Sequence, residues 1–272
     1  MVKHENFKTC SQSGFCKRNR QFADDAASSS WVSPYALDPA SITFKDGQLA
    51  ATVLKTLKDG QEKVRLPLII TFLESGVARV TLDEEKRQKG EITLRGDSKA
   101  RKERYNEAAN WAIVGGLDAA TGAALSGKAE EGFTKVFYGD GGKHQAIIRH
   151  QPFEIDFQRD GETQVKFNGR GLLNLEHWRE KVEKPKVEET KEEEKKEGEE
   201  EKKEEEKKEE EKKAEEPEGE DESTWWDETF GGNTDSKPRG PEAVALDISF
   251  PNYEHVYGIP EHATGLSLKT TR

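Results

Sequence analysis

The chain has 272 residues, a formal net charge of −11 and 36% charged residues, and only 32% of it is hydrophobic. No stretch is rich in Lys and Arg without matching acidic residues, which argues against a nucleic-acid-binding protein. The longest apolar run, 66–73, is less than half of the roughly 20 residues that a membrane-spanning helix needs.

No apolar signal-peptide core follows Met1, so we expect either a cytosolic protein or one whose signal has been removed. The first 30 residues are polar and show no sustained hydrophobic period. They contain the only two cysteines, Cys10 and Cys16. These could form a small disulfide loop, supply half of a metal site or be unrelated thiols. The metal interpretation is weak because a zinc site usually needs two more Cys or His nearby, and only His4 is close.

The region 31–182 has the alternation of antiparallel β-strands with one solvent-exposed face. Asp46-Gly47 and Asp160-Gly161 are hairpin turn signals between alternating segments. The spacing of the turns predicts a β-sandwich or barrel. The alternating segments are 41–45, 48–54, 64–72, 77–82, 153–157 and 165–167.

Two stretches in this region lack a strand pattern. Residues 108–127 are rich in Ala and Gly, which favours a loop or short helix over a strand. The sequence Gly-Asp-Gly-Gly at 139–142 predicts a turn, because no helix signal follows it as a phosphate-binding loop would require.

Residues 183–222 carry the net charge of the whole chain. They include 22 acidic and 11 basic residues, which leaves the other 232 residues neutral. The unit Glu-Glu-Glu-Lys-Lys occurs three times in register, and almost no apolar side chain is present to pack on a core. This composition predicts a solvated, partly helical insertion, with an acidic docking arm or a weak Ca²⁺ buffer as alternatives.

The pattern of a half-buried strand returns after the acidic segment, where Val244, Leu246, Ile248 and Phe250 alternate with small or polar residues. A tail of about 50 residues is too short to build its own core, so this strand should pair with the sheet that precedes the insertion. Trp225-Trp226-Asp227-Glu228 should be an amphipathic re-entry into that sheet. Its two carboxylates would point to opposite faces of a strand and could not serve one bond.

Catalytic motifs are scarce in this sequence, which contains no P-loop, GxGxxG, HExxH, GxSxG or CxxC. Glu261 and His262, which follow a Gly-x-Pro turn, are the candidate functional residues. A Glu-His pair could orient a substrate hydroxyl, but more often makes a contact at the rim of another domain.

Several segments together resemble one enzyme family. They are Phe7–Cys10, Phe15–Arg18, Pro152–Asp156, Asn168–Leu173 with Glu176-His177, Trp226–Phe230, Asp235–Pro241 and His255–His262. In this order they resemble the N-terminal region of family 31 glycoside hydrolases. The resemblance covers most of the chain except about 83–130 and the acidic segment.

The resemblance implies a galactose-mutarotase-like antiparallel β-sandwich placed before a (β/α)8 barrel. Members of this family hydrolyse α-glycosides with retention, which requires two carboxyl groups about 5 Å apart, and both are on the barrel. The nucleophile motif of the family is absent here and the chain stops at Arg272. We therefore expect no catalytic residue, metal or cofactor in this chain, and expect it to be one piece of a nicked or split enzyme.

The resemblance also implies a compartment and partners. It places the protein in the lumen of the endoplasmic reticulum, where disulfides persist, and so favours a Cys10–Cys16 bridge. The implied partners are the C-terminal catalytic barrel fragment of the same enzyme, a β-subunit and a glucosylated N-glycan that loses α1,3-linked glucose. Glu261 and His262 become candidate residues of the substrate-pocket rim.

We therefore expect four parts: an N-terminal segment (1–30), the first part of the sandwich (31–182), the acidic insertion (183–222) and the continuation of the sandwich (223–272). Two other functions compete with a non-catalytic part of an α-glucosidase. A stripe of exposed aromatic residues on one sheet face would favour a free-standing carbohydrate-binding or interaction module, whereas a large exposed apolar patch would favour the enzyme part. An acidic Ca²⁺-buffering lumenal protein is the third hypothesis.

Overall fold

A computed structural model describes residues 7–57, 60, 63–73, 75–84, 112, 126–177, 225–237, 240–258 and 265–270. The chain divides into two compact units, one of 1–17 with 178–242 and a larger one of 18–177 with 243–272. Within the described residues, no helix is long and apolar enough to cross a membrane.

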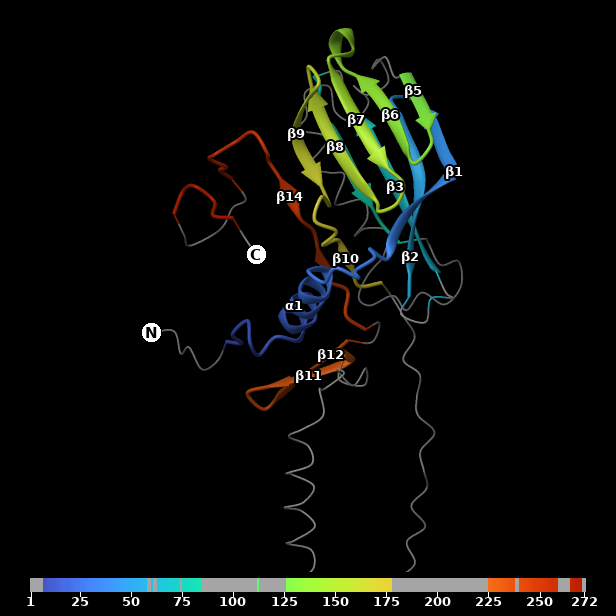
Figure 1. Ribbon diagram of the computed structural model, residues 1–272. Coiled ribbons are helices and arrows are strands. Elements are labelled where there is room, and N and C mark those ends of the chain that lie inside the picture. The colour runs from blue at the N-terminus through green and yellow to red at the C-terminus, as the bar shows by residue number, and fades with distance from the viewer. Residues whose placement is uncertain are drawn as a thin grey trace, which may run out of the picture. The chain divides into compact units, whose positions relative to one another are not determined.

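The larger unit contains two antiparallel sheets that face each other (Figure 1). The first sheet has the order β1 (Tyr35–Lys45), β2 (Gln48–Thr56), β3 (Lys63–Phe72), β4 (Ala78–Leu82). The second has the order β14 (Ile248–Ser249), β9 (Glu162–Phe167), β8 (Glu154–Arg159), β7 (His144–Arg149), β6 (Phe133–Tyr138), β5 (Ser126–Glu130). The expected β-sandwich is confirmed.

Both predicted Asp-Gly turns are present. Asp46 and Gly47 have φ angles of 48° and 72°, and Asp160 and Gly161 have 51° and 83°. Positive φ at both central residues is the geometry of the turns whose twist matches a two-stranded hairpin, and Asp followed by Gly tolerates it. The first turn joins β1 to β2 and the second joins β8 to β9.

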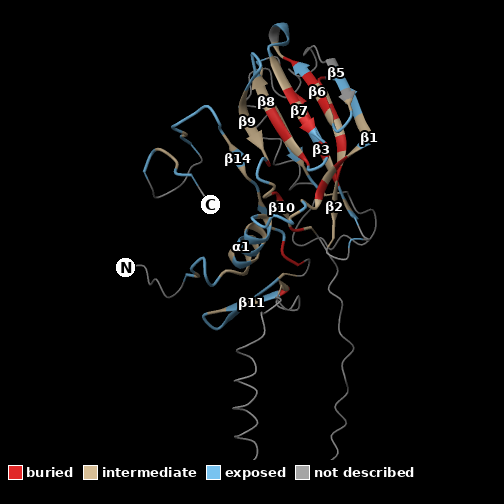
Figure 2. Ribbon diagram, viewed as in Figure 1, coloured by how far each residue is buried: buried red, intermediate tan, exposed pale blue. Residues whose placement is uncertain are grey.

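The core is formed by residues of both sheets, and Figure 2 shows these buried residues along the strands of the sandwich. Alternate residues of β2 and of the first part of β3 are buried, as the period of two predicts. The largest fully buried side chains are Tyr35, Phe72, Phe153, Leu49, Leu66, Leu68, Ile70, Leu73, Ile148, Ile155, Leu173 and Val53.

His150 is a polar member of this interior and gives the sandwich an acid-sensitive point. Its Nε2 lies 2.9 Å from Thr134 Oγ1, and burial lowers the pKa of its imidazole below the ordinary 6.5. The imidazole of the unfolded chain then binds a proton more tightly than that of the folded chain. Protonation should therefore lower the free energy of unfolding as the pH falls below 6.5, and His150 should have no such effect above that pH.

We expect His150→Gln, whose amide can keep a hydrogen bond to Thr134, to lose less stability than the wild type as the pH falls below 6.5. Urea unfolding at several pH values measures this difference. Parallel profiles for the two proteins would show that His150 does not cause the acid sensitivity.

The N-terminal segment, for which the sequence predicted no element, contains helix α1 (Gly14–Ala26). None of its residues is fully buried. The helix uses few apolar contacts, chiefly Phe22, whose ring meets Trp31 edge-on at 5.0 Å. A helix that buries so little leaves no sustained hydrophobic period in the sequence.

Strand β5 begins at Ser126, whereas a loop or short helix was expected as far as residue 127. The prediction is therefore wrong for residues 126 and 127. The rest of 108–127, apart from Ala112, lies outside the described residues. A Cβ on Gly127 would lie 2.4 Å from the ring of Phe44, so glycine lets β1 approach β5 at this edge. The turn predicted at 139–142 is present and includes the short 3₁₀ helix η3 (Asp140–Gly142).

The strand expected after the acidic segment is confirmed as two short strands. β13 (Val244–Ala245) pairs with β10 (Asn174–Leu175), and β14 pairs with β9. Segments from both sides of residues 183–222 therefore share sheets in the larger unit.

The smaller unit contains a separate two-stranded hairpin, β11 (Asp227–Phe230) and β12 (Asn233–Ser236). Within the described residues β11 pairs with β12 alone, so the expected re-entry into the main sheet is wrong. Gly231 and Gly232, with φ angles of 57° and 79°, form a tight turn that closes this hairpin on itself.

Candidate functional site

Of the four site residues predicted from the sequence, the structure describes Cys10 and Cys16. Glu261 and His262 lie outside the described residues. Cys10 is exposed, Cys16 is half-buried in α1, and both are free thiols in this structure. The Cys10–Cys16 bridge is not formed here and stays a prediction. Among the described side chains, no group of three or more His, Cys, Asp or Glu could hold a metal ion.

The carboxylates of Asp227 and Glu228 are both engaged in contacts within the smaller unit. Asp227 accepts a hydrogen bond from Ser236 Oγ at 2.6 Å. Glu228 accepts the Gly14 amide at 2.9 Å and Lys237 Nζ at 2.8 Å, and Lys8 Nζ lies 3.2 Å away. These partners lower the pKa of Glu228 to about 2, with the Gly14 amide as the largest cause.

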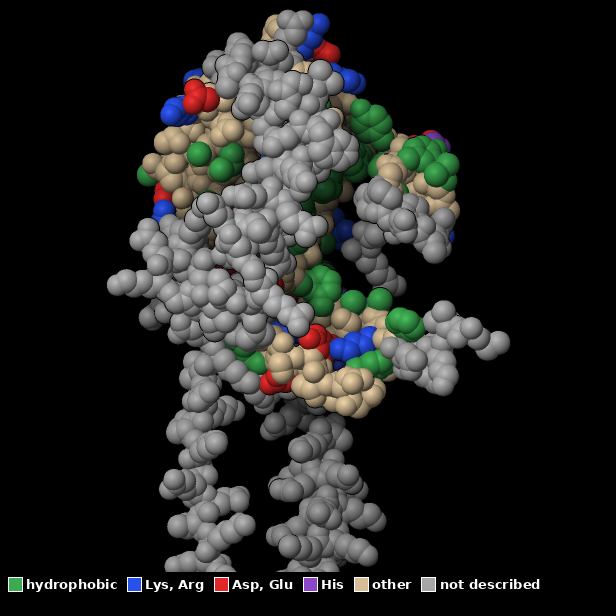
Figure 3. Space-filling view, turned by 180° about the vertical axis from the view of Figure 1, so that it is seen from behind, with side chains coloured by type: hydrophobic (Ala, Val, Ile, Leu, Met, Phe, Trp, Pro, Cys, Tyr) green, Lys and Arg blue, Asp and Glu red, His purple; other side chains and the backbone are tan. Residues whose placement is uncertain are grey.

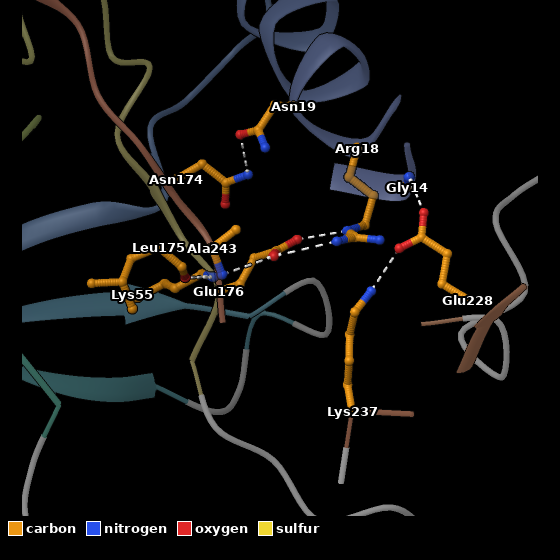
Figure 4. Close-up of polar contacts among 10 residues, drawn as sticks. All are labelled: Gly14, Arg18, Asn19, Lys55, Asn174, Leu175, Glu176, Glu228, Lys237 and Ala243. Carbon is orange, nitrogen blue, oxygen red and sulfur yellow. Dashed lines mark hydrogen bonds and ion pairs between the residues drawn. The ribbon is translucent and has the colours of Figure 1, made fainter. Parts of the chain in front are cut away.

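In the larger unit, Arg18 and Glu176 form a buried ion pair, labelled in Figure 4. Arg18 Nε donates to Glu176 Oε1 at 2.6 Å and Nη2 donates to Oε2 at 3.3 Å. The two side chains are only 11% and 7% exposed. This fork of hydrogen bonds joins α1 to the end of β10.

The same carboxylate ties together the two ends of the chain that flank residues 177–242. Glu176 Oε2 accepts the Ala243 amide at 3.2 Å, and the Glu176 amide donates to the Ala243 carbonyl at 2.9 Å. Lys55 Nζ donates to the Leu175 carbonyl at 2.7 Å (Figure 4). We call this cluster of Arg18, Lys55, Leu175, Glu176 and Ala243 the neck.

Tyr35 supports the neck from inside the core. Its hydroxyl accepts the Leu175 amide at 2.8 Å, and its side chain is fully buried. Burial raises the pKa of this phenol, so Tyr35 stays neutral. The neck is thus a structural junction in which polar groups bond to one another.

A second junction holds the loop 168–173 against the segment after β13. Asp247 Oδ2 accepts the Arg170 amide at 2.8 Å and Oδ1 accepts the Leu172 amide at 2.9 Å. Asn168 Nδ2 donates to the Phe153 carbonyl at 2.6 Å, and its Oδ1 accepts the Leu173 amide at 2.7 Å. The motif Asn168–Leu173 was singled out in the sequence, but its connection to Asp247 was not.

The burial of the segment 244–250 differs from the prediction. Val244, Leu246, Ile248 and Phe250 were expected to be the covered side of a half-buried strand, but all four are exposed. Residues 243, 245, 247 and 249 are the half-buried ones instead. Ile248 pairs with Phe167, which packs against the core, so the apolar side continues the core-facing side of the sheet without being covered. Asp247 lies on the other side of the segment, where its carboxylate accepts both amides of the loop 168–173.

The observed features define an antiparallel β-sandwich with a neck at the base of an insertion and an exposed apolar edge. The family described as glycosyl hydrolase 31 N-terminal galactose mutarotase-like domain matches residues 67–272. The chain belongs to this family.

Relatives of known identity match along nearly the whole chain. Glucosidase 2 subunit alpha of Schizosaccharomyces pombe is 34% identical over 97% of this chain, and neutral alpha-glucosidase AB of Sus scrofa is 35% identical over 99%. The chain spans about a quarter of the length of each, with 25% of the relative covered.

Solved structures give the same result. A crystal structure of a glucosidase II alpha subunit in a DNJ-bound form is 52% identical, with a TM-score of 0.73 over 100% of this chain and 25% of the other. A crystal structure of an ER glucosidase II heterodimeric complex, of the catalytic subunit and the binding domain of the regulatory subunit, is 53% identical, with a TM-score of 0.72 over 98% of this chain and 25% of the other.

Proposed function

We propose that this chain is the N-terminal, non-catalytic part of a retaining α-glucosidase of the glucosidase II type. The observation that supports this most strongly is the match over 97% to 100% of the chain to proteins about four times as long. In such an enzyme the catalytic carboxylates would come from the rest of the polypeptide, and this sandwich would support the catalytic barrel.

The proposed substrate is a glucosylated N-glycan, from which the enzyme removes α1,3-linked glucose. Two of the similar crystal structures are of glucosidase II alpha subunits in Glc1Man2-bound and alpha3-Glc2-bound forms, each 52% identical to this chain. Glu261 and His262 are proposed to line the rim of that substrate pocket. In the full-length enzyme, Glu261→Gln should raise KM or weaken domain docking, and unchanged kinetics and stability would remove Glu261 from the rim.

The proposed location is the lumen of the endoplasmic reticulum, and the proposed protein partner is the glucosidase II β-subunit. The similar ER heterodimer of a catalytic and a regulatory subunit supports both proposals. Disulfides persist in that compartment, so Cys10 and Cys16 are proposed to form a bridge there. Peptide mapping of the secretory-pathway protein without reductant would detect the linked pair, and two alkylated thiols would exclude it.

The decisive experiment compares the 272-residue chain with the full-length polypeptide that contains it. We expect the full-length protein to release glucose from an α1,3-linked disaccharide, and the chain alone to release none above the buffer blank. Full-length protein without any α-glucosidase activity would overturn the proposed function. Activity of the chain alone would overturn its non-catalytic role.

A further inference from the structure

Asn168, directly after β9, is a buried residue whose polar groups are all bonded. Its φ angle of 60° lies in the left-handed region, which Asn adopts more readily than most residues. The Asn168 amide donates to the Asp247 carbonyl at 2.9 Å, and the Asn168 carbonyl accepts the Gly171 amide at 3.1 Å. The side-chain amide adds its bonds to Phe153 and Leu173. Asn168 is therefore a central residue of the junction between the loop 168–173 and the segment after β13.

The residue that follows Asn168 makes it chemically distinctive. Asn168-Gly169 is the only Asn-Gly pair in the sequence. In such a pair the glycine backbone nitrogen, which has no neighbouring side chain to hinder it, can attack the side-chain carbonyl carbon of asparagine. A new carbon–nitrogen bond closes a succinimide ring, the bond to the side-chain nitrogen breaks, and that nitrogen leaves as ammonia. Water then opens the ring at either carbonyl, which yields aspartate or isoaspartate without any oxidation or reduction.

The folded loop opposes this reaction. The Asn168 side chain must rotate to bring its carbonyl carbon to the Gly169 nitrogen, and ring closure removes the amide that donates to the Phe153 carbonyl. The Leu173 amide, at 2.7 Å, holds the oxygen of the same side chain. Breaking these bonds inside the protein leaves buried polar groups unpaired, and each then carries its full desolvation cost. The reaction therefore requires the loop 168–173 to open, as it does in the unfolded chain.

The product of the reaction does not fit the folded loop. An ionised aspartate only accepts hydrogen bonds, so it would place a charge against the Phe153 carbonyl oxygen, which lies 2.6 Å from the present amide nitrogen. Isoaspartate adds a carbon to the main chain and would displace the Arg170 and Leu172 amides from Asp247.

The C-terminal part of the chain would also be loosened, because Asp247 belongs to it. Hydrophobic side chains reach the surface of this part at the right edge of Figure 3, and Val244, Leu246, Ile248 and Phe250 are among those exposed. A segment of this kind that loses its bonds to the loop 168–173 exposes more apolar surface. The modified chain should therefore be prone to aggregate.

We propose that Asn168-Gly169 is a deamidation site that the fold keeps unreactive, and whose reaction in the unfolded chain prevents the native loop from forming again. Survival of the protein then depends on how long the chain stays unfolded as well as on its free energy of unfolding. This inference is independent of the proposed function, because it uses only the contacts of the loop 168–173 with Phe153 and Asp247.

The test compares the rate of deamidation in the folded and the unfolded 272-residue chain at mildly alkaline pH. One sample is kept in buffer and the other in guanidinium chloride above the unfolding midpoint. Peptide mapping by mass spectrometry follows the conversion of amide to acid at Asn168, with Asn252, which precedes Tyr253, as the reference in the same digests. Gly169→Ala is the matched variant, because it keeps Asn168 and hinders the attacking nitrogen. It is compared in guanidinium chloride, so its fit in the folded loop does not affect the result.

We expect Asn168 to deamidate at least about tenfold faster in the unfolded chain than in the folded one, since the folded chain reacts only through rare open states. In guanidinium chloride it should also react faster than Asn252 and faster than Asn168 of the Gly169→Ala chain. After dilution of the denaturant, the yield of folded protein should fall in proportion to the deamidated fraction. Wild-type chain that has been unfolded only briefly is the control for refolding.

Equal rates in buffer and in guanidinium chloride would overturn this inference, because the fold would then not protect Asn168. A rate in the unfolded chain no faster than that of Asn252, or unchanged in Gly169→Ala, would overturn the assignment of the site. Deamidated chains that refold with the yield and the unfolding curve of the unmodified protein would show that the loop accepts the product, and would overturn the consequence for refolding.

Discussion

Replacing Arg18 by methionine is expected to lower the free energy of unfolding of the sandwich by about 3–5 kcal/mol. The substitution leaves the Glu176 carboxylate, only 7% exposed, without the guanidinium that lies 2.6 Å from it. A buried charge that loses its partner keeps its full desolvation cost, and Met is close to Arg in length, so packing is largely preserved. Urea unfolding of the 272-residue chain measures the change.

Two further variants separate the buried charge from the loss of a surface contact. Lys45→Met removes a partner of the exposed Lys45–Asp46 pair, whose side chains are 87% and 67% exposed, and should have no measurable effect. Adding Glu176→Gln to Arg18→Met should recover part of the lost stability, because the unpaired charge is then gone. An Arg18→Met protein as stable as the wild type would show that the neck does not depend on this ion pair.

Replacing Phe153 by alanine should be similarly severe, with a loss of about 3–5 kcal/mol. Phe153 is fully buried, and its ring packs against Phe167. Its backbone also joins two elements, since its amide donates to the Tyr35 carbonyl at 3.0 Å and its carbonyl accepts Asn168 Nδ2. The cavity left by alanine would therefore form where β1, β8 and the loop 168–173 meet.

Phe153→Leu is the matched control, since it keeps most of the buried volume and should cost less than about 1.5 kcal/mol. Thermal or urea unfolding of both variants checks the prediction. If alanine and leucine were equally harmful, the aromatic contact with Phe167 would matter more than the filled volume.

The strands and hairpins of the sandwich could be predicted because their signals are local. Alternation over 64–72 marks a strand wherever it sits in the fold, and Asp46-Gly47 adopts positive φ angles that few other dipeptides tolerate. The helix α1 could not be predicted in this way. Its main connection is Arg18 to Glu176, residues 158 positions apart, and such a contact leaves no periodic pattern near the helix.

The segment 244–250 shows the same limit of prediction from local sequence. Alternation at 244–250 correctly indicates two faces, but the same alternation is compatible with either face turned toward the core. Ile248 pairs with Phe167, whose ring packs against the core, so the apolar side does continue the core-facing side of the sheet. It is exposed because the described residues of the opposite sheet do not cover it, and hydrophobicity alone contains no information about how far that sheet extends.

By itself, the sequence determined the composition-level features of this protein: a neutral β domain, one acidic segment that carries the charge of −11, and a resemblance to family 31 enzymes that the family match confirms. Only the tertiary structure decided that Glu176 and Ala243 close a neck at the base of the insertion and that Val244, Leu246, Ile248 and Phe250 are exposed. The physical reason is that strand propensity and turn chemistry act over a few residues. Whether a strand at the edge of a sheet is covered, by contrast, depends on contacts between segments far apart in the chain.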